Sequence, residues 1–228
     1  MTNRLQKAKR AYVLHRSRRT IVKVHGLPRS GTNYLTKLIK LNFPDVICAS
    51  GSELGWKHGP IAGPSRRGFV VIVRHPLAWL EAFHHWEVAH GRSTAETVGE
   101  FLVTDVSHPE LVQTWETADP LAIWNSASTS WLESPNQPEF VRYEDLLRDL
   151  SGTLDSALKS FGLEKPSTGY VDLAERADSW STTIVRRRLD PTRDLQQSYL
   201  DAYSRDQLET IRTGLSVNNL ARLGYEIA

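Results

Sequence analysis

The sequence predicts an α/β fold, a three-layer sandwich in which helices cover both faces of a central parallel sheet. Apolar strand patterns alternate with amphipathic helix patterns along the chain, as in folds built from repeated β-α units. Residues 69–73, FVVIV, are apolar without interruption, which is typical of a strand buried on both faces. A chain of 228 residues with 40% apolar content can bury one substantial core, so we expect a single domain over residues 1–228, with a basic N-terminal segment at 1–18.

The individual elements follow from hydrophobic periodicity and from the signals at their ends. We expect the strands at residues 20–25, 46–49, 69–73 and 139–143. We expect helices at residues 76–90, 95–103, 121–132 and 146–161, and a final helix that includes Leu208, Ile211 and Leu215. Pro76 is favoured at the first position of its helix. In the helix expected at 146–161, Asp145 can cap the start and Gly162 the end.

Residues 20–41 combine an apolar strand, a turn with two glycines and the start of an amphipathic helix. A helix that begins directly after such a turn presents unpaired backbone N–H groups and the positive end of its dipole to an anion. The turn also carries a cation and polar donors, in the run Pro28, Arg29, Ser30, Gly31, Thr32 and Asn33. The segment therefore predicts a phosphate-binding site, and a tight strand-to-helix turn without a ligand is the alternative.

This loop departs from the nucleotide-triphosphate motif G-x-x-x-x-G-K-[ST], in which the lysine reaches the terminal phosphates and the hydroxyl holds magnesium. Gly26 and Gly31 keep the glycine spacing, but Thr32 and Asn33 stand at the lysine and hydroxyl positions. Arg29, ahead of the second glycine, supplies the cation of the loop. We therefore expect the loop to bind a phosphate group but not the terminus of Mg-ATP.

Four segments together resemble the sulfotransferase family. Residues 28–32, PRSGT, resemble the 5′-phosphosulfate loop of enzymes that use 3′-phosphoadenosine 5′-phosphosulfate (PAPS) and need no metal. Residues 74–76, RHP, follow the FVVIV strand and are similar to the family's R-x-P, whose arginine, here Arg74, binds the 3′-phosphate. Residues 140–146, FVRYEDL, resemble a later strand-to-helix junction, and residues 223–225, LGY, resemble the ending of many bacterial members. The resemblance implies a P-loop NTPase-like fold.

Two departures from the family pattern concern the 3′-phosphate. Ala82 stands eight residues after Arg74, where the family has a serine that also contacts this phosphate. The glycine-rich basic motif near the C-terminus of the cytosolic animal enzymes is absent, and residues 182–188 stand in its place. By position, we expect the basic run in this segment to contact the donor, with an exposed charge run as the alternative; the run is Arg186, Arg187 and Arg188.

The resemblance also points to the catalytic residues. Lys57 and His58 approximate the family's K-x-H without its middle residue, so we expect His58 to act as the general base and Lys57 as a cation on the donor. Arg29 is expected to neutralise charge on the leaving 5′-phosphate. Glu53 is the reserve candidate for the base, because some sulfotransferases use a carboxylate. A hydrogen-bonding role without catalysis is the alternative for His58.

Together these features predict a sulfotransferase that moves the sulfuryl group of PAPS to a hydroxyl or amine of a small-molecule or glycan acceptor, with PAP as product and no metal. Two alternatives remain: a P-loop kinase of a small molecule, and a catalytically silent module that binds PAP or another nucleotide. The segment 90–134 is expected to shape the acceptor pocket, and Trp56 is a candidate to line an acceptor or adenine pocket.

Composition narrows the class of protein further. The net charge is +2, and no nucleic-acid motif or aromatic interleaving accompanies the basic residues, so binding to DNA or RNA is not expected. The spacing of His84, His85 and His90 lacks the i, i+4 pairing that places two imidazoles on one metal. The single cysteine, Cys48, cannot form an internal disulfide, and no apolar run approaches the roughly 20 residues of a membrane span. We therefore expect a cytoplasmic protein.

Overall fold

Four parallel strands form the centre of the fold in the computed structural model, which describes residues 20–49, 54–62, 68–173 and 192–227. The strand order is β2-β1-β3-β4, and the register pairs Val24 with Val70 and Val71 with Phe140. The strands are β1 (Ile21–His25), β2 (Ile47–Ala49), β3 (Gly68–Val73) and β4 (Glu139–Arg142). The predicted central parallel sheet is therefore confirmed, and each strand agrees with its expected range to within one residue at either end.

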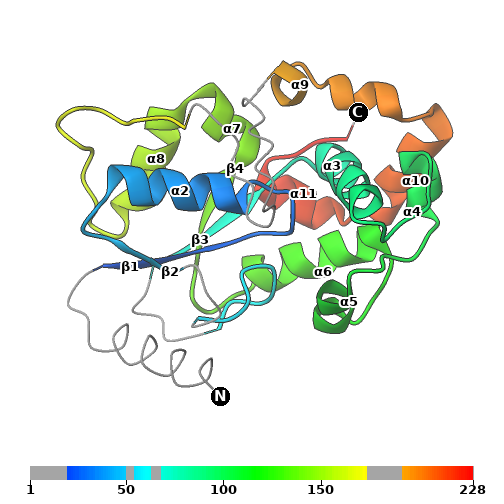
Figure 1. Ribbon diagram of the computed structural model, residues 1–228, viewed down its shortest axis with the longest axis horizontal. Helices are drawn as coiled ribbons and strands as arrows, with labels where there is room; N and C mark the ends of the chain where they lie inside the picture. The colour runs from blue at the N-terminus through cyan, green and yellow to red at the C-terminus, as the bar shows by residue number, and fades with distance from the viewer. Residues whose placement is uncertain (1–19, 50–53, 63–67, 174–191, 228) are drawn as a thin grey trace.

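Helices flank this sheet on both faces, which gives the three layers seen in Figure 1. Helices α2, α7 and α8 lie on one side of the sheet in this view, and α5 and α6 lie on the other. The helices are α2 (Thr32–Asn42), α3 (Pro76–Ala89), α4 (Val98–Leu102), α5 (Pro109–Trp115), α6 (Pro120–Leu132), α7 (Tyr143–Arg148), α8 (Leu150–Lys159), α9 (Thr192–Leu195), the 3-10 helix η1 (Ser198–Ala202), α10 (Arg205–Gly214) and α11 (Val217–Leu223).

Alternating side chains of the strands divide the interior into two main apolar cores. Val70 and Ile72 of β3 point into the core formed with α2 and α8, whereas Val71 and Val73 point into the core formed with α3 and α6. This is the period-2 pattern of a sheet covered on both faces, and it explains why FVVIV is apolar throughout. Trp124 and Trp131 of α6, seven residues apart, are both buried in the second core.

The helix expected at residues 146–161 is wrong as a single element, because α7 ends at Arg148 and α8 begins at Leu150. Asp149 between them has a non-helical backbone, with φ −141° and ψ 86°, and its side chain accepts a hydrogen bond from the Gly152 amide at 2.9 Å. An aspartate that caps the next helix satisfies an N–H group that would otherwise lack a partner, so the break is local and stable. Asp145 lies inside α7 and is not the cap.

The C-terminal part of the chain also differs from the expected single last helix. Helix α10 starts at the Ser204 capping box, ends before Leu215, and is followed by a separate helix, α11. Ser216 caps α11 by accepting a hydrogen bond from the Asn219 amide at 3.3 Å.

Within the described ranges, no helix has both the length and the apolar character needed to cross a membrane.

Candidate functional site

The loop between β1 and α2 has a backbone that only glycine accommodates at two positions. Gly31, with φ 95°, immediately precedes α2, and a Cβ at this position would lie 2.6 Å from the Tyr143 ring. A Cβ on Gly26, with φ 152°, would lie 2.4 Å from the carbonyl oxygen of Ile72. Because Gly31 has no side chain to cap the helix, the first amides of α2 are left to water or to a ligand in the loop. A loop of this geometry can bind an anion.

Three hydrogen bonds hold the loop in this conformation. The buried indole Nε1 of Trp79 on α3 donates to the Pro28 carbonyl at 2.8 Å. The Gly26 amide donates to the Lys57 carbonyl at 3.0 Å, and the Ser30 amide donates to the Leu27 carbonyl at 3.1 Å. The loop is therefore braced from both sides, by α3 and by the segment that carries Lys57.

Lys57 and His58 lie directly beside the loop. The Lys57 Nζ donates to the Asn33 Oδ1 at 2.7 Å, which links it to the first turn of α2. The His58 Nδ1 lies 2.5 Å from the Gly26 carbonyl oxygen. A carbonyl oxygen only accepts, so Nδ1 carries the proton and the lone pair of the neutral ring is on Nε2. The two residues expected to do the chemistry are thus attached to the loop expected to bind the donor.

Both side chains have lowered pKa values. Burial, and secondly the charge of Lys57, lower the pKa of His58 to about 3, so its imidazole is neutral at physiological pH. Burial, and secondly the charge of Lys23, lower the pKa of Lys57 to about 8, so its ammonium is still mostly charged there. This pairing of a neutral imidazole with an adjacent cation suits a base next to an anionic donor.

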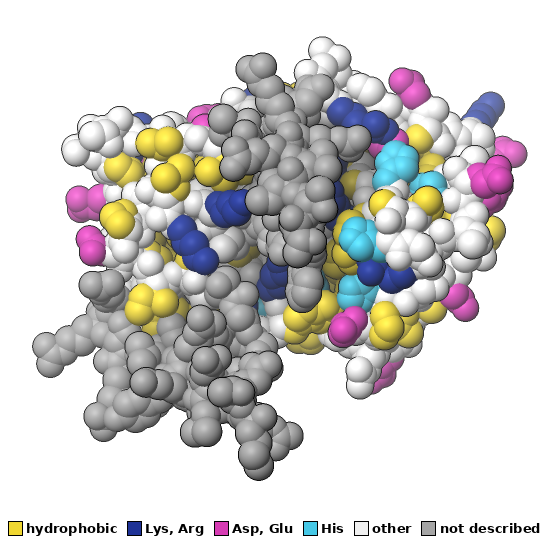
Figure 2. Space-filling model, viewed as in Figure 1, with side chains coloured by type: hydrophobic (Ala, Val, Ile, Leu, Met, Phe, Trp, Pro, Cys, Tyr) yellow, Lys and Arg dark blue, Asp and Glu magenta, His cyan; other side chains and the backbone are white. Residues whose placement is uncertain are grey.

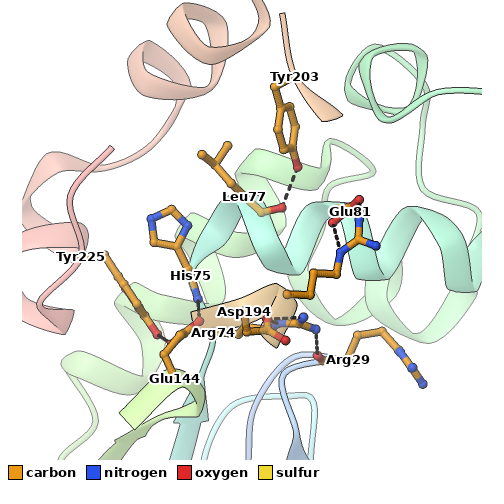
Figure 3. Close-up of polar contacts among 10 residues, drawn as sticks. Arg29, Arg74, His75, Leu77, Glu81, Glu144, Asp194, Tyr203 and Tyr225 are labelled. Atoms are coloured by element: carbon orange, nitrogen blue, oxygen red, sulfur yellow. Dashed lines mark hydrogen bonds and ion pairs between the residues drawn. The ribbon is translucent and has the colours of Figure 1, made fainter. Parts of the chain in front are cut away.

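Arg74, at the end of β3, lies against the same loop. Its side chain is only 5% exposed, and its Nη1 donates to the Arg29 carbonyl oxygen at 3.2 Å (Figure 3). Its Nε donates to the Asp194 Oδ1 at 2.8 Å, and its Nη2 makes a second, shorter contact with the same oxygen. The two arginines expected at opposite ends of the donor are therefore neighbours, but the side chain of Arg29 is turned away from Arg74.

Glu144, in the FVRYEDL segment, is hydrogen-bonded to the RHP and LGY segments. Its Oε1 accepts from the His75 amide at 2.8 Å, and its Oε2 accepts from the Tyr225 hydroxyl at 2.9 Å. Burial raises the pKa of this carboxyl. The RHP, FVRYEDL and LGY segments thus meet at one buried carboxyl group, which fixes the end of β3 relative to the C-terminus (Figure 3).

A cluster of aromatic and histidine side chains extends from His58 towards α3. The Trp56 ring centroid lies 5.2 Å from that of His58 and 6.1 Å from that of His108, which stacks on Trp86 at 5.4 Å. The Arg92 guanidinium lies 4.0 Å above the Trp86 ring. Figure 2 shows histidine side chains gathered at the surface over and beside α3, next to basic side chains. Trp56 is therefore placed beside the candidate base.

Not every expected residue can be placed. Glu53 and the run Arg186, Arg187 and Arg188 lie outside the described residues. Ala82 lies on α3 and offers no donor, while the neighbouring Glu81 pairs with Arg193 of α9. Of the three histidines considered for a metal, His84 is buried with its Nε2 2.9 Å from the Ala95 carbonyl oxygen. Within the described ranges, no group of three or more His, Cys, Asp or Glu side chains is arranged to hold a metal ion.

Three residues at the site were not selected from the sequence. Asp194 lies 120 positions from Arg74 in a four-residue helix, and no motif marks it. Trp79 is a buried residue of α3, and its indole also holds the loop. His25, the last residue of β1, is fully buried with its Nδ1 3.3 Å from the Gly59 carbonyl oxygen, and burial lowers its pKa to about 4. In the sequence it reads as an ordinary strand residue, and no motif marks it as part of a site.

Comparison with known proteins identifies the fold. No family model matches the sequence, and no curated protein matches it. Among solved structures, the mouse sulfotransferase SULT7A1, complexed with PAP, matches over 92% of this chain and 89% of its own, with a TM-score of 0.57 and 16% sequence identity. This chain has the sulfotransferase fold. A sulfotransferase from Alicyclobacillus acidocaldarius also matches over 91% of this chain and 95% of its own, with 13% identity and a TM-score of 0.49.

The sulfotransferase fold is P-loop NTPase-like, which agrees with the strand, loop and helix order seen here around Gly26 and Gly31. In this chain the loop joins β1 to α2 and lies next to the end of β3, where Arg74 follows Val73. Ligands of open α/β sheets bind outside the carboxyl ends of the strands, which is where these residues meet.

Proposed function

We propose that this chain is a PAPS-dependent sulfotransferase that transfers a sulfuryl group to a hydroxyl or amine of a small-molecule or glycan acceptor and releases PAP. One observation carries the proposal: the neutral imidazole of His58 is hydrogen-bonded through Nδ1 to Gly26 of the phosphate loop, which leaves Nε2 as the acceptor of a proton. The PAP bound to the mouse sulfotransferase of the same fold supports the choice of donor. The buried Cys48 agrees with a reducing compartment, so we place the reaction in the cytoplasm.

The residues of the loop fit the 5′ end of such a donor. The uncapped amides at the start of α2 and the backbone of Gly31 offer N–H groups to a phosphate or sulfate oxygen. Arg29 adds a positive charge within the same turn, and Lys57 adds another from the opposite side. Thr32 stands where a kinase loop has lysine, which disfavours a Mg-ATP terminus.

Arg74 fits the 3′-phosphate by its place at the end of β3, in contact with the Arg29 carbonyl oxygen. We assign further positive charge at this end to Arg186, Arg187 and Arg188, which stay predictions because they lie outside the described residues. PAPS supplies an activated sulfuryl group whose leaving group is the 5′-phosphate of PAP.

The chain's own residues then perform two tasks. His58 Nε2 takes the proton of the acceptor hydroxyl as the acceptor oxygen forms its bond to sulfur and the bond from sulfur to the 5′-phosphate oxygen breaks. Lys57 and Arg29 stabilise the charge that gathers on this leaving phosphate oxygen, and such fixed charges are usually the largest catalytic term. The bound anionic donor raises the pKa of His58 from its low value and thus strengthens the base. Glu53 remains the reserve base.

A second candidate, a nucleotide-binding module without transfer, is favoured by two observations. Asp194 is already paired with the guanidinium of Arg74, and Ala82 adds no hydrogen-bond donor. Incubation of the purified protein with sulfur-35-labelled PAPS and a broad set of alcohols and amines separates the two. Labelled product that disappears in His58→Ala supports the sulfotransferase. If PAP binds while no acceptor is ever labelled, the silent module is correct.

A further inference from the structure

The carboxylate of Asp194 is paired with Arg74, the arginine to which the proposed function assigns the 3′-phosphate. The Asp194 Oδ1 accepts from Nε of Arg74 at 2.8 Å and from Nη2 at a shorter distance, and both side chains are nearly excluded from solvent, at 4% and 5% exposed. The third nitrogen, Nη1, donates to the Arg29 carbonyl oxygen at 3.2 Å. Every nitrogen of the guanidinium is therefore engaged by the protein itself.

Asp194 is brought to this position by a short segment that is anchored independently. Arg193, the preceding residue on α9, pairs with Glu81 of α3, with Nε 3.1 Å from Oε2. Further along, the Tyr203 hydroxyl donates to the Leu77 carbonyl oxygen at 2.6 Å, at the start of α3 (Figure 3). The segment from α9 to Tyr203 thus lies across the start of α3 and presents Asp194 to Arg74.

We propose that Asp194 is a competing counter-ion, which holds Arg74 until a phosphate group on the nucleotide takes its place. The inference rests on the proposed function, because it assigns the displacing group to the 3′-phosphate of PAPS or PAP. A phosphate carries more negative charge than a carboxylate and matches the guanidinium as a hydrogen-bond acceptor, so it can replace Asp194. A neutral ribose hydroxyl cannot, because it would leave a buried arginine without a counter-charge.

The exchange has a direct consequence for affinity. Binding of PAP must include the cost of separating Asp194 from Arg74, and a carboxylate left near the phosphate repels it. Binding of AMP, which has no 3′-phosphate, carries no such cost. Removal of the Asp194 charge should therefore tighten the binding of PAP and leave that of AMP unchanged, because the carboxylate competes only with a ligand that carries the 3′-phosphate.

The test is isothermal titration of PAP and AMP into the wild type, Asp194→Asn and Asp201→Asn. Asparagine still accepts a hydrogen bond from Arg74, and Asp201 in η1 is an exposed acid on the same segment that controls for the change in net charge. We expect Asp194→Asn to bind PAP about tenfold more tightly, within the range of typical coupling between sites, with AMP and the Asp201→Asn variant unchanged. Equal PAP binding by Asp194→Asn overturns the inference, because Asp194 then does not compete with the ligand. Weaker PAP binding also overturns it, because Asp194 would then orient Arg74 for the ligand.

The two proposals fail in different ways. If the wild type and Asp194→Asn bind PAP equally well, the competing role of Asp194 is wrong and the proposed function stands. If neither protein binds PAP, the proposed function falls and this inference falls with it. A crystal structure of the wild type with PAP needs no variant: a phosphate on Arg74 with Asp194 displaced supports the exchange, and a phosphate bound while Asp194 still contacts Arg74 refutes it.

Discussion

The Nζ of Lys57 lies 2.7 Å from the Oδ1 of Asn33, so the segment that carries His58 is attached to the first turn of α2. This segment also accepts a hydrogen bond from the Gly26 amide through the Lys57 carbonyl. Two hydrogen bonds therefore join the segment of the candidate base to the candidate phosphate loop. Such preorganisation is what a transfer reaction requires of its binding groups.

Replacement of His58 by alanine should lower kcat by about a hundredfold to ten-thousandfold, because general bases typically contribute that much. PAP affinity should change little, because the role assigned to His58 is to take the proton of the acceptor and not to bind the donor. Steady-state kinetics with labelled PAPS measures the first quantity and calorimetry the second. Full activity in His58→Ala together with its loss in Glu53→Ala would transfer the role of base to Glu53.

The pH dependence of kcat/KM should be governed by Lys57. Its pKa in the free protein is about 8, so its ammonium loses charge as the pH rises through this value and kcat/KM should fall. The pKa of His58 is about 3, so its neutral form is present at all higher pH values, and the profile should be flat between about pH 5 and 7. In Lys57→Arg the alkaline decline should vanish, because arginine stays protonated. An unchanged decline in this variant would mean that another group titrates.

Gly31→Ala should destabilise the fold by about 2–5 kcal/mol, the sum of a left-handed backbone for a non-glycine residue and a clash in a packed site. The clash is with the Tyr143 ring, 2.6 Å from the added Cβ. Gly91→Ala is the matched control, because Gly91 has φ 66° but no atom within 4 Å of an added Cβ. Its cost should be about 1–2 kcal/mol, from the backbone alone. Urea unfolding measures both, and equal losses would contradict the close packing of Tyr143 on the loop.

Tyr225→Phe should lower the free energy of unfolding by about 1–3 kcal/mol, since it leaves a buried oxygen of Glu144 without its donor. Tyr170→Phe is the control, because the hydroxyl of Tyr170 also donates to a carboxylate, that of Asp155, at 2.7 Å, but both residues are partly exposed. Its loss should be smaller, about 0.5–1.5 kcal/mol. Thermal or urea unfolding that ranks the two variants in the opposite order would argue against a structural role for the buried Glu144 group.

The sequence was sufficient for the sheet and for the loop, because both depend on local patterns. FVVIV at residues 69–73 is a strand by its uninterrupted apolar character, and the glycines at positions 26 and 31 mark a turn before an amphipathic helix. The sequence was not sufficient at Asp149, where the apolar face continues through Leu147, Leu150 and Leu154 although the backbone breaks. Hydrophobic periodicity shows which face of a helix is buried, but it does not show whether the helix is continuous. Here the capping side chain of Asp149 sets the break.

The candidate site was predictable only where a residue lies close to a motif. Arg29, Lys57, His58 and Arg74 were selected in this way, and the structure places all four around the loop. Asp194 was not predictable, because its role depends on a contact across 120 positions from a helix of four residues. Local pattern contains no information on such a long-range ion pair.

The measurement that tests the central claim most directly is a thermal-shift comparison of PAP, AMP and Mg-ATP on the wild type. The account predicts the largest stabilisation by PAP, because Arg29 and Arg74 lie near one another at the loop and Thr32 replaces the lysine that a triphosphate requires. Stabilisation by Mg-ATP that exceeds that by PAP, or that disappears when magnesium is removed, would contradict it.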